Sequence, residues 1–217
     1  MEAAKTVVSF RLKRPIQIVL FYILLFGLGI LSFLYNLIAI VLYALLSEER
    51  GRLIGRAGIA YGYRLFWYCA QLAGLMCVDN KELDVLNHEA CGLIVASNHP
   101  SMADALLICA RLPRSVCIMK DSLLDNIFLG SGAKLARYIS NAPPRQMIRT
   151  SVENLRQGSH LVLFPEGTRT GPSDRAHPRQ LHPFRPGLTL IASKANAPIQ
   201  TVIIETNSPF LGKGWPI

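Results

Sequence analysis

Two short motifs hold the side chains best suited to do chemistry in this chain. Residues 98–104 read Asn-His-Pro-Ser-Met-Ala-Asp, and residues 164–169 read Phe-Pro-Glu-Gly-Thr-Arg. An imidazole exchanges protons near neutral pH, and a carboxylate beside it can fix its tautomer and stabilise its protonated form. The first motif therefore predicts that His99 is a general base and that Asp104 orients it.

The second motif follows an apolar run and has the composition of an anion-binding turn. A glycine at 167 allows backbone N–H groups to approach a ligand, and Thr168 can donate a hydrogen bond. Arg169 can hold a phosphate or carboxylate through two hydrogen bonds. We expect Glu166 to Arg169 to bind an anionic substrate. The alternative is a turn that ends a strand and carries a solvated arginine.

The first motif also has a purely structural interpretation. Ser101 and Asp104 fit the S-x-x-[DE] pattern of a helix capping box, so Asp104 could serve only to start a helix. A nucleophile is not evident, because the chain has no G-x-S-x-G motif and no cysteine next to His99. This favours direct attack by a substrate hydroxyl over a covalent enzyme intermediate.

The elements that must position these motifs alternate between strand and helix. Apolar runs predict strands, and helical patterns lie between them. We expect strands at 92–97, 115–119, 135–139, 160–164 and 199–205, and helices at 104–111, 146–157 and 186–195. We interpret Gly130-Ser131-Gly132 as a turn and 171–186 as an exposed loop. The pattern predicts an α/β fold, with a mixed, largely parallel sheet flanked by helices and both motifs at strand ends.

An apolar segment near the N-terminus indicates contact with a membrane. Residues 16–46 carry no charge, and a bilayer crossing needs about 20 apolar residues. A single tilted span is one geometry. A re-entrant hairpin, broken near 27–29 or 32–36, is the other, and we favour it because basic residues flank both ends. We therefore assign 1–50 to a membrane-associated helical segment.

The next helix, within 51–78, combines arginines with aromatic residues. It fits either a helix in the membrane interface or a helix of the domain whose aromatics pack in the core. We assign 51–217 to one catalytic domain. The chain ends without an obvious closing element, which suggests that the domain is truncated at its C-terminus.

Composition and charge indicate which kinds of molecule the protein could bind. The formal net charge is +9, and 51% of the residues are hydrophobic, so a basic surface accompanies the apolar segment. This fits the anionic face of a membrane, and no basic run interleaved with aromatics indicates nucleic acid. The five cysteines form no C-x-x-C pair, so neither a disulfide framework nor a metal site is predicted.

Taken together, N-H-x-x-x-x-D and F-P-E-G-T-R resemble the motif pair of the 1-acylglycerol-3-phosphate acyltransferase (lysophospholipid acyltransferase) family, which moves a fatty acyl group from a thioester to a lipid hydroxyl. The resemblance implies that His99 is the base, that Asp104 is its partner, and that Glu166, Gly167, Thr168 and Arg169 line the acceptor site. It also implies Lys120 as a stabiliser of the thioester oxyanion and a membrane-associated N-terminal segment. It implies no metal and no cofactor beyond acyl-CoA or acyl-carrier protein as co-substrate.

Two departures from the family pattern concern the acceptor. The family's glycerol-phosphate string, Gly-x-x-Phe-x-x-Arg, is not reproduced, and Arg137, Arg145 and Arg149 are the substitutes. A later Val-Pro-x-x-Pro block has Thr201 in place of its second proline. We expect 1-acylglycerol-3-phosphate as acceptor, with phosphatidic acid as product. A lyso-aminolipid acceptor, a non-catalytic lipid-binding protein and a hydrolase are the alternatives.

The expected partners are membrane lipids, a lysolipid acceptor and the acyl donor, without nucleic acid. We expect a membrane location with the catalytic domain on the cytoplasmic face, because thioester donors are cytoplasmic.

Overall fold

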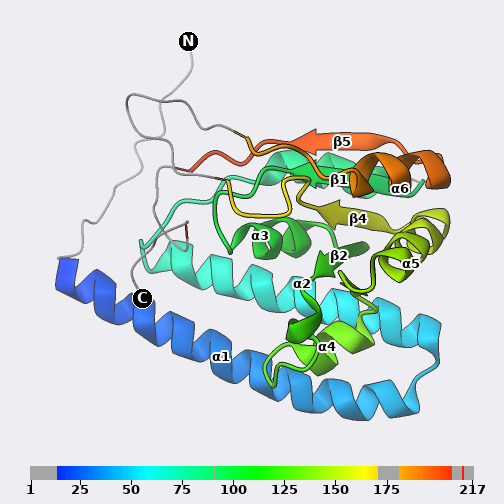
Figure 1. Cartoon of the computed structure of the whole chain (residues 1–217). Helices are drawn as coiled ribbons and strands as arrows, with labels where there is room; N and C mark the ends of the chain where they lie inside the picture. The colour runs from blue at the N-terminus through cyan, green and yellow to red at the C-terminus, as the bar shows by residue number, and fades with distance from the viewer. Residues whose placement is uncertain (1–13, 90, 171–180, 207–211, 213–217) are drawn as a thin grey trace.

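A computed structural model of the chain describes residues 14–89, 91–170, 181–206 and 212. Its centre is one five-stranded sheet in the order β3-β2-β4-β1-β5, with every neighbouring pair parallel (Figure 1). The strands are β1 (Leu93–Ser97), β2 (Ser115–Met119), β3 (Ile139–Ser140), β4 (His160–Leu163) and β5 (Ile199–Val202). The predicted α/β class is confirmed.

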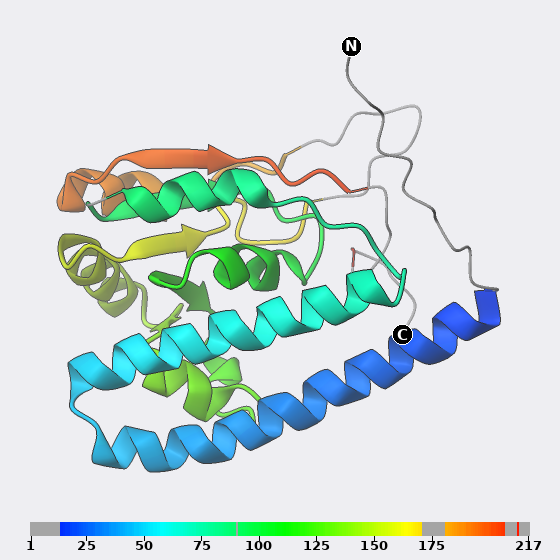
Figure 2. The same cartoon turned by 180° about the vertical axis from the view of Figure 1, so that it is seen from behind.

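Helices cover both faces of this sheet. They are α1 (Arg14–Leu45), α2 (Glu48–Leu72), α3 (Asp104–Arg111), α4 (Gly130–Leu135), α5 (Pro144–Arg156) and α6 (Gly187–Ala195), with short 3-10 helices η1 (Lys81–His88) and η2 (Asp121–Leu123). One face packs on α3 and η1, and the other packs on α5 and α6. Helix α2 lies over α3, and α1 lies outside α2, as both views show (Figures 1 and 2).

Residues of the central strands are buried on both faces, which explains why their sequences are continuous apolar runs. Val95 of β1 and Val162 of β4 are in register and belong to one core, whereas Ile94 and Leu161 belong to the other. Parallel pairing brings the carboxyl ends of β1 and β4 together at one edge of the sheet. Both motifs follow these ends.

Helix α1 is a single unbroken helix of 32 residues, so the predicted hairpin is wrong. A glycine inside a helix costs only about 1 kcal/mol, and an apolar setting favours keeping every backbone hydrogen bond within the helix. A side chain at Gly27 or Gly29 would meet nothing within 4 Å, so neither glycine marks a close contact or a bend. The stretch Pro15–Leu45 is long and apolar enough to cross a membrane.

The C-terminal half of α1 is fixed to the rest of the domain by polar side chains. Asn36 is buried; its Nδ2 donates to the carbonyl of Ile127 at 2.7 Å, and its Oδ1 accepts from the N–H of Gly132 at 2.9 Å. The hydroxyl of Tyr35 donates to the carbonyl of Gly55 in α2 at 2.8 Å. Helix α1 therefore lies along the domain, antiparallel to α2, instead of projecting from it (Figure 2).

Helix α2 has two different faces. Phe66 and Trp67 are buried against α3, as the core interpretation predicts, whereas Tyr61 and Tyr68 are exposed. Arg56 is buried, has no carboxylate partner among the described residues, and donates to Asn154 Oδ1, Ser159 Oγ and the carbonyl of Ala136. Burial lowers the pKa of its guanidinium to about 10. This arginine ties α2 to the domain through neutral oxygens.

The segment between β2 and β3 differs from the prediction. Gly130-Ser131-Gly132 begins helix α4 instead of forming a turn, and β3 is only Ile139–Ser140 instead of 135–139. The N–H of Gly132 is satisfied by Asn36 from α1, so a distant side chain caps this short helix. Most of the predicted 171–186 loop, 171–180, lies outside the described residues, as do 213–217.

Candidate active site

The chain after β1 brings His99 and Asp104 together. His99 follows β1 by two residues, Asp104 is the first residue of α3, and His99 Nδ1 lies 3.0 Å from Asp104 Oδ2. The carboxylate side chain is 2% exposed and the imidazole 19%. His99 Nε2 makes no hydrogen bond to the described part of the chain. An oriented base therefore presents one ring nitrogen outward.

Asp104 also has the structural role that its sequence context allows. Its Oδ2 accepts the N–H of Ser101 at 2.7 Å, and Ser101 Oγ accepts the N–H of Ala103 at 3.1 Å. The same carboxylate oxygen thus closes the turn into α3 and holds the imidazole. The two interpretations of this motif describe one arrangement.

The second motif supports the imidazole from the neighbouring strand. Phe164 follows β4, and its ring stacks on His99 with the centroids 4.0 Å apart and the planes 20° apart. This contact follows from the pairing of β1 with β4, which sequence reasoning did not use. It fixes the plane of His99.

Thr170 joins the two loops and was not predicted. Its Oγ1 accepts the backbone N–H of His99 at 2.9 Å, and its own N–H donates to the His99 carbonyl at 2.7 Å. Its hydroxyl donates to Glu166 Oε1. The main chain of His99 is therefore held on both sides by one residue, which lies directly after the F-P-E-G-T-R string.

The side chain of Glu166 is hydrogen-bonded within the protein. It is buried, and its Oε2 accepts the N–H of His182 at 2.9 Å while Oε1 accepts from Thr170. Both oxygens are thus engaged by the protein. Glu166 holds the loop through both oxygens, and its place in the acceptor site stays a prediction.

Residues 167–169 form the exposed part of this loop. Gly167 has φ +63°, and a side chain there would collide with Arg185, whose side chain lies against it. Thr168 is exposed, and Arg169 Nη1 donates to the carbonyl of Gly212 at 2.8 Å. The exposed Arg185 is a second basic group beside the loop. It was missed because it is distant in sequence and lies in a stretch interpreted as an exposed loop.

The other predicted basic residues, Lys120 and Arg137, lie at different distances from His99 along the sheet. Lys120 is exposed at the carboxyl end of β2, at the same edge of the sheet as His99. Arg137 precedes β3 and so lies at the opposite edge, where it contacts Glu48 at 3.8 Å and donates to the Tyr43 hydroxyl at 3.0 Å. The structure does not bring Arg137 to the site, so it is not a substitute for the missing arginine.

The two other substitutes lie on α5. Arg145 is exposed in its first turn, and Arg149 is paired with Glu153 at 2.9 Å on its surface.

Asn98 is a structural member of the first motif. Its Oδ1 accepts the N–H of Ile204 at 2.7 Å, and its Nδ2 donates to the Ile204 carbonyl at 3.0 Å. This pair of bonds holds the segment after β5 against the loop after β1. Asn98 thereby fixes one wall of the site.

A groove of about 1490 Å³ runs beside the carboxylate. Ser101 and Asp104 line it on the site side, while Ile18, Phe21 and Tyr22 of α1 line it on the other. The groove therefore extends from Asp104, the partner of His99, to the apolar helix.

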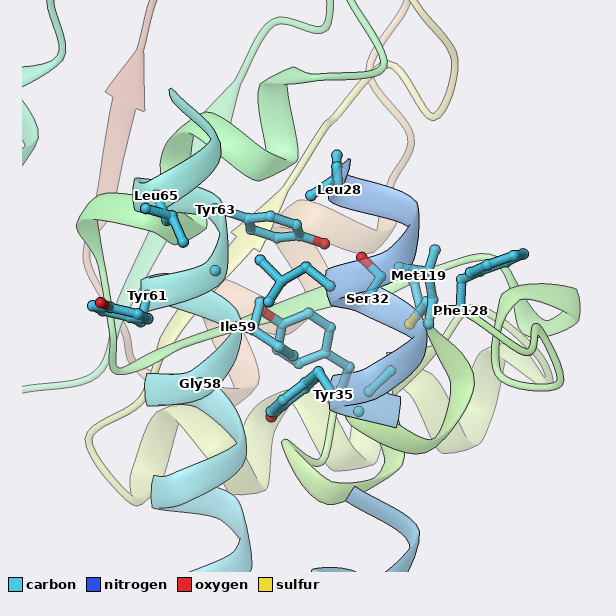
Figure 3. Close-up of a pocket in the computed structure, with 16 residues that line it drawn as sticks. Leu28, Ser32, Tyr35, Gly58, Ile59, Tyr61, Tyr63, Leu65, Met119 and Phe128 are labelled. Carbon is cyan, nitrogen blue, oxygen red and sulfur yellow. The ribbon is translucent and has the colours of Figure 1, made fainter. Parts of the chain in front are cut away.

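A second, apolar cavity of about 240 Å³ lies between α1 and α2 (Figure 3). Leu28 and Tyr35 of α1 face Ile59 and Tyr63 of α2 across it, and Met119 lies at the end of β2, next to Lys120. No group of three or more His, Cys, Asp or Glu side chains within the described residues is placed to hold a metal ion.

Comparison with known proteins identifies related sequences. The model of the family described as Acyltransferase matches residues 77–205, more than half of the chain. A 1-acyl-sn-glycerol-3-phosphate acyltransferase of Limnanthes alba is 28% identical over 69% of this chain and 52% of its own. The human 1-acyl-sn-glycerol-3-phosphate acyltransferase beta is 30% identical over 56% of this chain and 44% of its own.

The chain spans about half the length of these curated relatives. Among solved structures, the 1-acyl-sn-glycerophosphate acyltransferase PlsC of Thermotoga maritima superposes with a TM-score of 0.59 at 19% identity. The match covers 85% of this chain and 70% of that one. At this identity the match establishes a shared fold.

Proposed function

Because the chain belongs to the Acyltransferase family, as the two motifs predicted, we propose that it transfers a fatty acyl group from an acyl thioester to the hydroxyl of a lysolipid. The observation that carries this proposal is the 3.0 Å contact between His99 Nδ1 and Asp104 Oδ2 beside a groove shared with an apolar helix. Such a pair supplies a base where a lipid can reach it.

The proposed reaction needs no group besides these residues and the two substrates. His99 Nε2 takes the proton of the lysolipid hydroxyl while the hydroxyl oxygen attacks the carbonyl carbon of the thioester. Asp104 stabilises the resulting imidazolium. When the tetrahedral intermediate collapses, the C–S bond breaks, and the imidazolium returns the proton to the leaving thiolate. The products are an ester and a free thiol.

The proposed acceptor is 1-acylglycerol-3-phosphate, with phosphatidic acid as product. The names of the matched relatives support this choice, and so does a basic edge on the loop after β4. Arg185 lies exposed against Gly167, and Arg169 follows two residues later. A guanidinium binds a phosphate through paired hydrogen bonds. Lys120, exposed at the end of β2, is the proposed contact for the thioester oxygen.

The groove and the apolar cavity are the proposed sites of the two fatty tails. The groove runs from Asp104 to Phe21 and Tyr22 of α1, so a lysolipid can enter it from the side of that helix. The cavity between α1 and α2 reaches Met119, one residue before Lys120, and we propose that it takes the tail of the donor. Acyl-CoA and acyl-carrier protein both fit the basic surface.

We also propose that α1 and α2 lie in one leaflet of a membrane, with the catalytic domain on the cytoplasmic face, where thioester donors are found. Exposed apolar side chains cover α1, and on α2 the residues Ile54, Tyr61, Leu65, Tyr68 and Leu72 form an exposed stripe. Because Asn36 fixes α1 to the domain, α1 cannot cross the bilayer unless the domain enters it.

The proposal is tested by thiol release from an acyl-CoA, measured with and without 1-acylglycerol-3-phosphate in mixed micelles. The unchanged protein should release thiol only with the acceptor and form phosphatidic acid in equal amount. His99→Ala should lower this rate roughly 100-fold or more. His88→Ala, which removes an exposed histidine of η1, is the matched control and should not change it.

Three results would contradict the proposal. Equal thiol release without a lysolipid would indicate a hydrolase, and no release with any lysolipid would indicate a lipid-binding protein. An unchanged rate for His99→Ala would remove the proposed base. Transfer to a lyso-aminolipid, but not to the phosphate acceptor, would keep the reaction and replace the acceptor.

A further inference from the structure

From the turn at 126–129, between η2 and α4, we infer a third membrane contact: Ile127 and Phe128 enter the same lipid leaflet as α1. This inference rests on the membrane association of α1 proposed above and adds a segment from the middle of the catalytic domain to it. The side chains of Ile127 and Phe128 are 63% and 42% exposed, although both are large and apolar.

The turn is held beside α1 by side-chain contacts. Asn36 Nδ2 binds the carbonyl of Ile127 at 2.7 Å, and the rings of Phe33 and Phe128 lie 6.1 Å apart. In the view of Figure 3, Phe128 lies on the side of α1 away from α2. Figures 1 and 2 both show the connection to α4 reaching α1. The apolar surface of α1 therefore continues onto this turn.

Several backbone groups of the turn have hydrogen-bond partners inside the protein. Asn126 Oδ1 accepts the N–H of Phe128 at 2.8 Å, and the Asn126 carbonyl accepts the N–H groups of Leu129 and Gly130 at 3.2 and 2.7 Å. The carbonyl of Ile127 is bound by Asn36. These partners lower the cost of moving the turn into hydrocarbon, where each polar group left unpaired costs several kcal/mol.

Charged neighbours limit the depth of insertion. Asp125, with its side chain 84% exposed, precedes the turn and is paired with Lys134 at 3.2 Å. This ion pair belongs at the level of the lipid head groups, so only Ile127 and Phe128 reach the upper part of the acyl chains. The partner that fits this surface is a lipid bilayer, because the turn is continuous with a helix that carries no charge over 16–46.

Tryptophan quenching by brominated lipids tests this inference on the full chain. Ile127→Trp is compared with Phe26→Trp, at a site 71% exposed on α1, and with Val85→Trp, at a site 66% exposed on η1. The vesicles contain phosphatidylcholine and phosphatidylglycerol, with bromine near the top or near the middle of the phosphatidylcholine chains. The fluorescence of the unchanged protein is subtracted, because it has its own tryptophans.

The expected result is quenching at 127 and 26 but not at 85, with shallow bromine more effective at 127. Quenching at 26 without quenching at 127 overturns this inference and leaves the membrane contact of α1 in place. Absence of quenching at both 127 and 26 would contradict the membrane contact of the turn and that of α1. The reaction is tested separately by thiol release in micelles.

A binding measurement gives a second readout. Replacing Ile127 and Phe128 together by serine should weaken binding to the same vesicles roughly tenfold or more, because both apolar contacts are lost. Val85→Ser is the control and should bind as the unchanged chain does. Equal binding of the double variant overturns the inference. Thermal unfolding shows that the variant is folded, because Phe128 also lines the cavity proposed for the donor tail.

Discussion

The loops after β1 and β4 both carry a carboxylate within a recognisable motif, but they use it differently. Asp104 holds the imidazole of His99, whereas both oxygens of Glu166 accept hydrogen bonds from the protein. The first loop carries His99, and the second holds its main chain through Thr170 and its ring through Phe164. A carboxylate within a recognisable motif can therefore have both of its oxygens engaged by the protein.

Asp104→Asn should have the largest effect on catalysis. An amide cannot hold the required imidazole tautomer or stabilise the imidazolium, so kcat should fall by about 100-fold to 10,000-fold. Thiol release with saturating lysolipid measures this loss, and the KM for the lysolipid should change little. Asp84→Asn in η1 is the control. A loss confined to KM would mean that Asp104 acts on binding.

Glu166→Gln should act mainly on stability. An amide nitrogen cannot accept, so either the His182 N–H or the Thr170 hydroxyl loses its buried partner, which costs about 1 to 3 kcal/mol. Thermal unfolding measures this loss, and Glu153→Gln on the surface of α5 is the control. If the variant keeps full stability but loses as much activity as Asp104→Asn, the two loops do not differ as described.

Gly167→Ala tests the outer part of the second loop. Its φ of +63° costs an alanine about 1 to 2 kcal/mol, and the new Cβ would displace the Arg185 side chain. We expect lower thermal stability and a higher KM for the phosphate acceptor, with kcat little changed. An unaltered KM would separate Arg185 from the acceptor.

The smallest effect concerns the opposite end of β4. Burial, together with the nearby Arg114 charge, lowers the pKa of His160. Below about pH 6.5, His160 is protonated in the unfolded chain but stays neutral in the folded chain. The free energy of unfolding therefore decreases as the pH falls toward the lowered pKa, by at most about 1.4 kcal/mol per pH unit.

His160→Gln should remove this part of the acid sensitivity and leave activity at neutral pH unchanged. Unfolding midpoints between pH 7 and 5 measure it. If the unfolding midpoints of the unchanged chain and of His160→Gln depend on pH in the same way, His160 is not the source of the acid sensitivity.

The local sequence pattern was sufficient to predict much of the sheet and the contact between His99 and Asp104. Helix 104–111 and strand 115–119 were predicted with their observed bounds, because a strong apolar pattern ends there at proline or polar residues. The spacing of His99 and Asp104 placed them in one turn, since α3 begins at Asp104.

The predictions that failed depend on contacts between distant segments. Helix α4 begins at Gly130 because Asn36 binds the N–H of Gly132, and no local signal reports that bond. The roles of Thr170, Glu166 and Arg185 likewise come from loops that meet only in the folded chain. Arg137 was misplaced because position relative to a strand end decides which edge of the sheet a residue reaches.

The buried amide of Asn36 has a consequence for synthesis of the chain. Its carbonyl partner, at Ile127, is translated 91 residues later. Helix α1 therefore leaves the ribosome with a polar group in an apolar surface and no internal partner for it. Until the middle of the domain emerges, that amide must remain near water or lipid head groups, which disfavours deep burial of the nascent helix. An unrelated hydrophobic helix in place of α1 could bind the membrane, but the carbonyl of Ile127 and the N–H of Gly132 would lose their partner, Asn36.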